Sequence, residues 1–447
     1  MWNNKKNNLV QARKLNGFRD ILPNMAIQKS EMLKKLSETF QSFWFAPIET
    51  PHLEYADVLV WKWSDEIQKE LYRFEDWWKR DVALRFDQTV PLSRFTIENL
   101  KQQNIVLPFK RYAIWNVFRA EKAQKWRYRE FTQCDFDFIW TNSVASDVEI
   151  IQVIYASLKK IWIEKFTISL NNRKIMNWFF EYLWVSEKSE WILRVVDKIA
   201  KIWEEKVKKE LEEAEKISLE NVEKILEFVN LREENFSDSK KFFEKISEYK
   251  NFWDKIKIWI EELEKIYEIL WNLNIEKKFY RIDFSIARWL WYYTWMVYET
   301  TLDDLPKMWS VCSWWRYDNL TKSFSNEDIS WVWASIWLDR LLAALEELNL
   351  IEEKKSPAKV LIANMEEKFQ SEIFKIWEKL REKNIFTEIY PDAVKIQKQF
   401  KFADKQGFEF VLIIWEEEVK NWKYSLKNME SGEQVVCDFL ELVWKLI

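Results

Sequence analysis

Apolar residues in the first part of the chain change from helical to strand-like spacing. In residues 25–43, Met32, Leu36 and Phe40 lie one helical turn apart, which predicts a long helix that ends before Pro47. Residues 81–138 instead contain short runs rich in Val, Phe, Tyr and Ile, so we expect an antiparallel sheet there. Its turn signals are Pro91, Pro108 and the segment around Trp126. Helical spacing returns in residues 145–163.

The second half of the chain divides at a charged break. Residues 186–275 are rich in Lys and Glu with apolar positions at helical spacing, which predicts a coiled-coil or solvated helical insertion. Residues typical of β-strands return after residue 278, and a helix is expected at 337–349. The stretch IEEKKSP at 351–357 is the clearest domain boundary. Strand and helix patterns alternate after it, which predicts a small α/β domain with a mixed or mostly parallel sheet.

Composition changes how these patterns are interpreted, because the chain has 30 Trp and only 3 Gly in 447 residues. A soluble domain carries about 7% glycine, and the two counts together give an ordinary glycine total. Trp pairs also occupy polar, turn-like stretches such as Asp76-Trp77-Trp78-Lys79, where glycine would supply positive φ angles. Our hypothesis is that most of these Trp are glycine codons misread, as when UGA is glycine in the source lineage. A truly Trp-rich protein is the alternative, and uniform UGG codons would support it.

Charge and reactive side chains exclude several classes of function. The net charge of −4 carries no global nucleic-acid signature, so any RNA contact must come from local patches. Cys134, Cys312 and Cys437 are an odd number without paired spacing, which is typical of reduced thiols. His52 is the single histidine, so a metal site built from several histidines is excluded. No apolar run approaches the roughly 18 residues that span a bilayer, and we expect a soluble cytoplasmic protein.

Candidate chemistry begins in the stretch ALRFDQTVPLSRF. Strand alternation would place Asp87 and Thr89 on one face with Arg85. A carboxylate beside a hydroxyl can receive an ammonium group, so this stretch indicates an amine-binding position.

A denser cluster lies in PFKRYAIWNVFRAEKAQKWRYREFTQCDFDF, which predicts two strands joined by a loop. Arg119 precedes the loop, Arg127 and Arg129 follow it, and further on come Gln133, Asp135 and Asp137 at alternating positions. Arginines facing each other across a hairpin make a planar clamp for phosphate that lysine cannot match. Surface ion pairs are the alternative, but they do not explain such a density of Arg, Gln and Asp on one face.

Two Trp-rich stretches complete the set. ARWLWYYTWMVYET holds Arg288, Tyr292 and Tyr293, flanked by presumed glycines that would let a ligand approach the backbone. A tyrosine-rich core strand is the alternative there. SWVWASIWLDRLLAAL is, with glycine at its Trp positions, a glycine-rich strand that turns into a helix with Arg340. It has no Walker lysine and no dinucleotide spacing, so phosphate binding by arginines is the favoured interpretation.

These segments, in this order, resemble the histidyl-tRNA synthetases, which are class II aminoacyl-tRNA synthetases. The resemblance runs from LNGFRDILP at 15–23 to LKNMESGEQ at 426–434, nearly the whole chain. VFRAE with QKWRYREFTQCDFD looks like class II motif 2, SWVWASIWLDR like motif 3, and the first helix with FAPIETP like motif 1, the family's dimer interface. ARWLWYYTW and SVCSWWRYDNL resemble signatures peculiar to the histidyl enzymes.

The resemblance implies a fold and a reaction. The fold is an α+β catalytic domain with an antiparallel sheet at 1–350, which includes a helical insertion at 172–275. A linker at 351–357 leads to a C-terminal α/β anticodon-binding domain at 358–447. The family activates L-histidine with ATP and Mg²⁺ to histidyl-adenylate, and then transfers the histidyl group to tRNA(His). The resemblance further implies a cytoplasmic homodimer formed through motif 1.

Motif positions also imply roles for single residues. Asp87 and Thr89, beside Gln88, would hold the α-ammonium of histidine, and Gln133 and Asp137 would complete that pocket. The expected ATP ligands are Arg119 at the α-phosphate, Arg127 at the distal phosphates, Arg340 at the γ-phosphate and Glu121 near adenine. Arg119 would also grip the substrate carboxylate, Arg288 would stabilise charge at the α-phosphate, and Tyr292 and Tyr293 would line the imidazole pocket. Arg119 and Arg288 are thus the expected catalytic residues, and no side chain is assigned to a metal.

One departure and two alternatives stay open. Trp291 stands where the family often has an acidic residue, which leaves imidazole recognition unassigned. A catalytically silent paralogue that regulates histidine biosynthesis would share the fold, as would an RNA-binding module. The presence of Arg119, Arg288 and Arg340 and of residues 358–447 favours the ligase.

Overall fold

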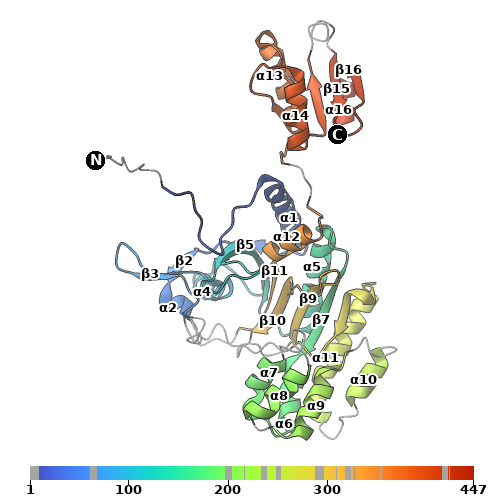
Figure 1. Cartoon of the computed structure of the whole chain (residues 1–447). Helices are drawn as coiled ribbons and strands as arrows, with labels where there is room; N and C mark the ends of the chain where they lie inside the picture. Colours follow the sequence, from blue (N-terminus) through green and yellow to red (C-terminus); the bar gives the residue numbers. More distant parts are fainter. Residues whose placement is uncertain are drawn as a thin grey trace, which may run out of the picture. The chain divides into compact units, whose positions relative to one another are not determined.

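The computed structural model divides into two compact units, residues 1–19 with 32–344 and residues 20–31 with 345–447 (Figure 1). The structure describes residues 10–60, 68–196, 204–215, 217–232, 239–247, 253–286, 296–308, 310–317, 324–325, 329–351, 355–414, 421 and 423–447. Within these ranges no helix is both long and apolar enough to cross a membrane.

An eight-stranded sheet forms the centre of the larger unit, in the order β1-β5-β6-β11-β10-β9-β7-β8. The strands are β1 Ala46–Pro47, β5 Phe109–Phe118, β6 Glu130–Ile139, β7 Phe166–Asn172, β8 Tyr280–Ile282, β9 Met296–Leu302, β10 Cys312–Tyr317 and β11 Trp331–Trp337. The six inner strands pair antiparallel, and only the edge strands β1 and β8 run parallel to their neighbours. The predicted antiparallel sheet is therefore confirmed.

Amphipathic helices pack against this sheet, as their apolar spacing predicts. In α1 (Pro23–Ser42) the buried residues include Met32, Leu36 and Phe40, and the Phe40 ring lies 4.8 Å from that of Phe136 on β6. Ser143 caps α5 (Val144–Lys160) by accepting a hydrogen bond from a backbone N–H of its first turn. The helix α12 (Leu338–Glu347) follows the last strand of this sheet, β11, directly.

The Lys/Glu-rich segment is helical, as expected, but it forms a bundle of short helices and not a coiled coil. Its helices are α6 Arg173–Tyr182, η1 Ser186–Lys188, α7 Ser189–Val196, α8 Glu204–Glu215, α9 Leu219–Val229, α10 Ser239–Ser247 and α11 Trp253–Asn272, followed by η4 Lys277–Phe279. Phe228 stacks on Phe179 at 4.1 Å and on Phe284 at 5.1 Å. These rings join the bundle to the segment that follows β8, and α11 packs along α5 (Figure 1).

One predicted strand is wrong. The structure has a small sheet of β2 (Leu53–Tyr55), β4 (Asp81–Leu84) and β3 (Arg73–Glu75), next to α2 (Ala56–Val60). After β4, however, the chain forms the helix α4 (Thr89–Lys101) and no further strand before β5. Pro91 lies in the first turn of this helix, where proline is tolerated because its missing N–H would have no acceptor within the helix.

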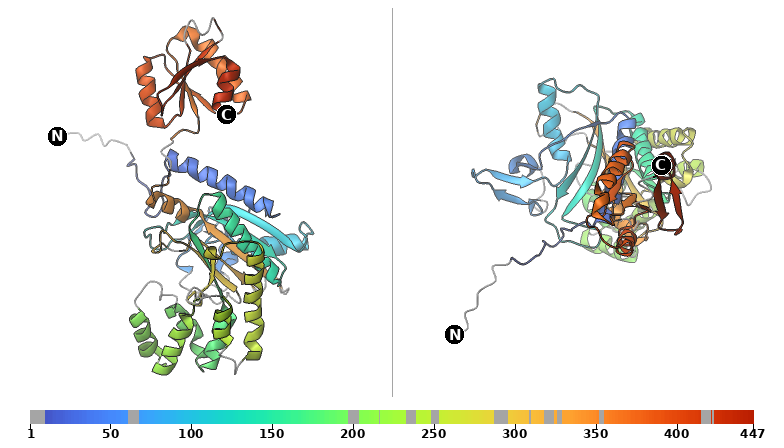
Figure 2. Two further views of the ribbon diagram at one scale, coloured as in Figure 1. Left: turned by 90° about the vertical axis from the view of Figure 1, so that its right-hand side faces the viewer. Right: turned by 90° about the horizontal axis from the view of Figure 1, so that it is seen from above.

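The smaller unit contains a five-stranded mixed sheet in the order β13-β12-β14-β15-β16. Its elements after residue 357 are β12 Val360–Ile362, η6 Glu367–Phe369, α13 Gln370–Glu382, β13 Thr387–Ile389, α14 Ile396–Gln406, β14 Phe410–Ile413, β15 Tyr424–Asn428, β16 Gln434–Cys437 and α16 Phe439–Leu446. β13, β12 and β14 are parallel, and β15 and β16 form an antiparallel hairpin. Val360 and Ile362 pack with α13 and α16, and Leu361 packs with α14 on the other face, so helices cover both faces (Figure 2). The predicted mixed sheet is confirmed.

Candidate active site

The four side chains predicted to bind ATP line one pocket. Arg119, Glu121 and Arg127 lie in the connection between β5 and β6, and Arg340 lies in the first turn of α12. β11 runs antiparallel to β6, with Trp337 opposite Gln133, so the end of β11 reaches the same end of the sheet as the β5–β6 loop. Strand pairing thus brings together residues that are far apart in the sequence. The other lining residues are Trp126, Tyr128, Phe131, Trp337 and Asp339.

Each cation of this pocket is held in place by its neighbours. Arg127 forms an ion pair with Glu121, which is 8% exposed. The Nε of Arg119 donates to the backbone carbonyl of Phe86 at 3.2 Å, and its guanidinium lies 4.3 Å above the Phe86 ring. Arg340 donates to the carbonyl of Ser310 at 2.6 Å. Three oriented guanidinium groups around one pocket suit a polyphosphate.

Asp339 is a positioning residue that the sequence analysis did not single out. Its carboxylate accepts a hydrogen bond from the backbone N–H of Thr132 on β6 at 2.6 Å and pairs with Arg19 at 2.6 Å. The Arg19 guanidinium in turn lies 4.0 Å above the ring of Tyr128, which lines the pocket. Asp339 therefore fixes the start of α12, and with it Arg340, against β6. The adjacency of Asp339 to Arg340 in the motif 3 stretch was the available signal.

Asp87 lies beside Arg119, but not for the reason that strand alternation suggested. β4 ends at Leu84, Gln88 is the N-cap of α4, and Asp87 accepts hydrogen bonds from the backbone N–H groups of Thr89 at 3.1 Å and Val90 at 3.3 Å. Burial raises the pKa of the Asp87 carboxyl, and the charge of Arg119 opposes that rise. A carboxylate held at a helix start near a fixed cation can still receive an ammonium group.

The expected grouping of Arg85 with Asp87 and Thr89 on one strand face is wrong. Arg85 is fully buried and donates to the backbone carbonyls of Asn116 at 2.9 Å and Thr50 at 3.0 Å. Its side chain joins the small sheet to the main sheet, because β4 has already ended and the backbone turns into α4.

Gln133, Asp135 and Asp137 alternate along β6 as predicted, and all are buried. Gln88 donates to the backbone carbonyl of Gln133 at 2.9 Å, so the start of α4 is attached to this strand. Arg111 on β5 stands opposite Asp137 in the strand register and pairs with it at 2.6 Å.

Burial raises the pKa of both carboxyl groups on β6. It raises the pKa of Asp137 well above its usual range and that of Asp135 to about 6, and Arg111 opposes both shifts. Sequence reasoning missed Arg111, because its role depends on which residue it faces across the hairpin.

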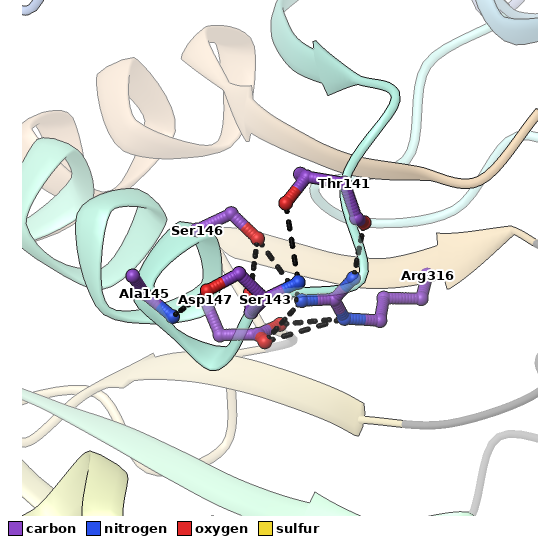
Figure 3. Close-up of polar contacts among 6 residues, drawn as sticks. All are labelled: Thr141, Ser143, Ala145, Ser146, Asp147 and Arg316. Carbon is purple, nitrogen blue, oxygen red and sulfur yellow. Dashed lines mark hydrogen bonds and ion pairs between the residues drawn. The ribbon is translucent and has the colours of Figure 1, made fainter. Parts of the chain in front are cut away.

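Arg316, in the stretch SVCSWWRYDNL, does not line the pocket but contacts the residues around the start of α5 (Figure 3). Its guanidinium forms an ion pair with Asp147 at 2.5 Å, inside the first turn of α5. It also donates to the carbonyls of Thr141 and Ser143, both at 2.7 Å, and to the hydroxyl of Ser146 at 3.0 Å. Burial raises the pKa of Asp147, and the charge and hydrogen bonds of Arg316 oppose this shift. This side chain joins β10 to the start of α5.

Arg288, Tyr292 and Tyr293, together with Trp291, lie outside the described residues. The three cysteines are buried, and none of them forms a disulfide bond. Within the part of the chain that the structure describes, no group of three or more His, Cys, Asp and Glu side chains could hold a metal ion.

Comparison with protein-family models gives two matches along the chain. The model described as histidyl-tRNA synthetase matches residues 17–339, and the model described as anticodon binding domain matches residues 359–447.

Known proteins resemble the chain over its whole length. It is 52% identical over 443 residues to a histidine–tRNA ligase of Wolinella succinogenes, with 99% of each chain covered. It is 51% identical over 429 residues to a histidine–tRNA ligase of Helicobacter pylori, with 96% of each covered.

Solved structures agree. The structure of histidyl-tRNA synthetase from Nostoc sp. PCC 7120 has a TM-score of 0.88 at 32% identity, covering 98% of this chain and 99% of that one. An ATP phosphoribosyltransferase regulatory subunit/histidyl-tRNA synthetase from Bacillus halodurans has a TM-score of 0.71 at 19% identity, covering 91% of this chain and 98% of that one, which shows the fold alone. The resemblance noted in the sequence is confirmed, and the chain belongs to the histidyl-tRNA synthetase family.

Proposed function

We propose that this protein is a histidine–tRNA ligase, which activates L-histidine with ATP and transfers the histidyl group to tRNA(His). The observation that carries the proposal is the convergence of Arg119, Arg127 and Arg340 with Glu121 around one pocket. Identity of about half of all residues with histidine–tRNA ligases supports the same reaction. A silent regulatory paralogue is not favoured, because these charged side chains and the second unit are all present.

In the first step, a carboxylate oxygen of histidine attacks the α-phosphorus of ATP. A new O–P bond forms, the bond from the α-phosphorus to the bridging oxygen breaks, and pyrophosphate leaves with the electron pair. No proton needs to move, so the protein contributes alignment and neutralisation of charge. We assign Arg119 to the α-phosphate and the substrate carboxylate, since its fixed guanidinium lies between Asp87 and the nucleotide pocket.

The remaining arginines would bind the rest of the triphosphate. Arg127 takes the distal phosphates and Arg340 the γ-phosphate, because each already lines the pocket with its guanidinium held by a neighbour. Glu121 lies near adenine in this assignment. Arg288 would stabilise charge at the α-phosphate, an assignment that rests on its motif position alone.

Histidine would lie over β6, next to the start of α4. Asp87 and Thr89, beside Gln88, bind its α-ammonium, and Gln133 and Asp137 complete the pocket. Tyr292 and Tyr293 line the imidazole in this proposal. Polar partners for the imidazole matter, because a site that hydrogen-bonds its substrate strongly rejects analogues that lack those groups.

Magnesium enters this scheme as part of the nucleotide substrate. The described residues do not fit a metal site made by protein side chains alone, whereas Mg²⁺ is commonly bound through substrate phosphates. The ion would supply neutralisation of the pyrophosphate, and the arginines around the pocket would orient it.

The second unit would recognise the tRNA. We assign residues 358–447 to anticodon binding, 351–357 to a linker, and 1–350 to catalysis with a helical insertion at 172–275. A homodimer through the α1 region, motif 1, completes the proposal.

Histidine-dependent exchange of pyrophosphate into ATP tests this function. The assay uses a chain with glycine at every Trp position, beside the chain with all its tryptophans. Exchange that requires histidine, followed by charging of tRNA(His), is the expected result. A folded glycine chain that binds ATP without any exchange would instead favour the silent paralogue.

A further inference from the structure

Helix ends in this protein share one backbone motif, and its left-handed position is where tryptophan recurs. Each of eight described helices is followed by a residue in the left-handed conformation, with positive φ. The backbone N–H of that residue donates to the carbonyl three residues earlier, and the N–H of the next residue donates to the carbonyl five residues earlier. The left-handed residues are Trp44, Gln103, Trp162, Trp184, Asn274, Asn349, Asn384 and Gly407. Glycine is favoured at this position and asparagine is tolerated, because a side chain crowds the backbone when φ is positive.

At two of these helix ends the tryptophan side chain is almost fully exposed, so little packing offsets the strain of its positive φ. Trp44 has φ of 67° and is 87% exposed, and Trp184 has φ of 59° and is 93% exposed. A bulky residue with positive φ is a genuine outlier, and an exposed indole has little packing to compensate for it. Gly407 occupies the same position after α14 with φ of 75°. The backbone at Trp44 and Trp184 is therefore one that favours glycine.

A tryptophan with positive φ also occurs in the β5–β6 loop, whose residues line the nucleotide pocket. Gln124 and Arg127 exchange backbone hydrogen bonds of 3.2 and 3.0 Å across a tight turn, in which Trp126 is the third residue with φ of 64°. A turn with positive φ at its third residue requires glycine or asparagine. The indole of Trp126 forms part of the wall of the pocket.

A second indole closes the pocket from another side. Trp337 is the last residue of β11, is 8% exposed, and lies with its ring 4.2 Å from the Arg340 guanidinium. The free volume among Arg119, Arg127 and Arg340 is about 20 Å³, which is room for roughly one water molecule. Ligand pockets usually hold about 300–1,000 Å³, so a nucleotide cannot enter between these two indoles.

Tryptophans also lie over the polar side chains of β6, Asp135 and Asp137. Trp333 stands opposite both Asp137 on β6 and Trp315 on β10, and therefore shares their face of the sheet. The rings of Trp315 and Trp333 lie 4.0 Å apart, and the Trp333 indole donates to Asp135 at 2.9 Å. Glycine at positions 315 and 333 would leave this face of the sheet open above Asp137. The expected histidine site therefore supports glycine at Trp positions, as the nucleotide pocket does.

We infer that the working enzyme carries glycine at positions 126 and 337, and that these two glycines open the nucleotide pocket. The codons written as tryptophan here would then be read as glycine in the cell. The argument for glycine codons comes from the backbone conformation at the helix ends, so it does not depend on any enzymatic activity. The identity of the bound nucleotide, by contrast, rests on the proposed function.

Three otherwise identical chains test the inference. The first has glycine at every Trp position, the second retains only Trp126 and Trp337, and the third retains only Trp44 and Trp184. Binding of MgATP is measured by titration calorimetry, and the melting temperature by circular dichroism. The third chain is the matched control, because it also retains two tryptophans. Both of them lie at exposed helix ends, and neither lines the pocket.

We expect the all-glycine chain to bind MgATP and the second chain to bind it at least 100-fold more weakly while remaining folded. The third chain should bind MgATP as the first does, but melt a few degrees lower because of the strain at its two positive-φ positions. Equal MgATP binding by the first and second chains would overturn the pocket part. An unchanged melting temperature in the third chain would overturn the backbone part.

Two further readouts separate this inference from the proposed function. The gene should carry UGA at positions 44, 126, 162, 184 and 337, and UGG at all of them would overturn the inference. If the all-glycine chain binds MgATP but shows no histidine-dependent exchange, the proposed function fails while the pocket inference stands.

Discussion

Replacing Arg316 by methionine tests whether one buried cation holds α5 to the central sheet. The side chains of Arg316 and Asp147 are each 2% exposed, and Arg316 also donates to two backbone carbonyls at 2.7 Å. Methionine keeps an unbranched, apolar side chain in the same space, but it leaves the Asp147 carboxylate without its cation. Breaking a buried ion pair in this way costs about 3–5 kcal/mol.

The cost of the Arg316→Met substitution should depend on pH. Burial raises the pKa of Asp147 above 3.8, and Arg316 opposes this shift, so its removal raises the pKa further. A group with a raised pKa in the folded state adds stability below its unfolded pKa and loses it as pH rises. The variant should therefore lose less stability at pH 5 than at pH 7.

Urea unfolding followed by circular dichroism measures these differences in the all-glycine chain, in which Arg316 keeps its hydrogen-bond partners Thr141, Ser146 and Asp147. Arg316→Met and Asp147→Leu are compared singly and together, and the double variant should lose roughly 0.5–3 kcal/mol less than the sum. Arg73→Met, which breaks the exposed pair with Asp81, is the control and should cost at most about 1 kcal/mol. The reasoning is refuted if Arg316→Met costs no more than Arg73→Met.

Three further predictions concern the proposed reaction. Arg119→Ala should lower pyrophosphate exchange by about 10²–10³-fold, because it removes a donor to the developing charge, and Arg119→Lys should recover only part of it; exchange within tenfold of the parent would contradict the assignment. Asp87→Asn should raise the KM for histidine about 10–100-fold with a smaller effect on kcat, since it weakens a charged hydrogen bond; an unchanged KM would place the ammonium elsewhere. Removing residues 357–447 should spare exchange and abolish efficient charging of tRNA(His), and loss of both activities in steady-state assays would mean that this segment is structural.

Elements whose apolar spacing serves one buried face were predictable from the sequence. Met32, Leu36 and Phe40 predict α1, and the alternation after residue 357 predicts the mixed sheet, because burial of one face needs only spacing. α4 was missed, since Thr89, Val90 and Pro91 favour extended backbone when read locally. The Asp87 carboxylate accepts hydrogen bonds from two backbone N–H groups of the first turn and so stabilises the start of this helix, which apolar spacing does not encode.

The charged residues of the candidate site were predictable by chemical type and by motif, and Arg119, Glu121, Arg127 and Arg340 do meet in one pocket. The residues that position them were not, because their partners are set by strand register. Arg111 faces Asp137 only through the pairing of β5 with β6.

The place of β11 in the sheet has a consequence for synthesis on the ribosome. β11 lies between β6 and β10, yet about 200 residues separate it from the end of β6. At roughly 5–20 residues per second, the nascent chain would keep the edge of the β5–β6 hairpin unpaired for about 10–40 s. Unpaired strand edges recruit other chains, so this interval is when the emerging protein most needs a chaperone, and slower elongation through the α6–α11 insertion would prolong it.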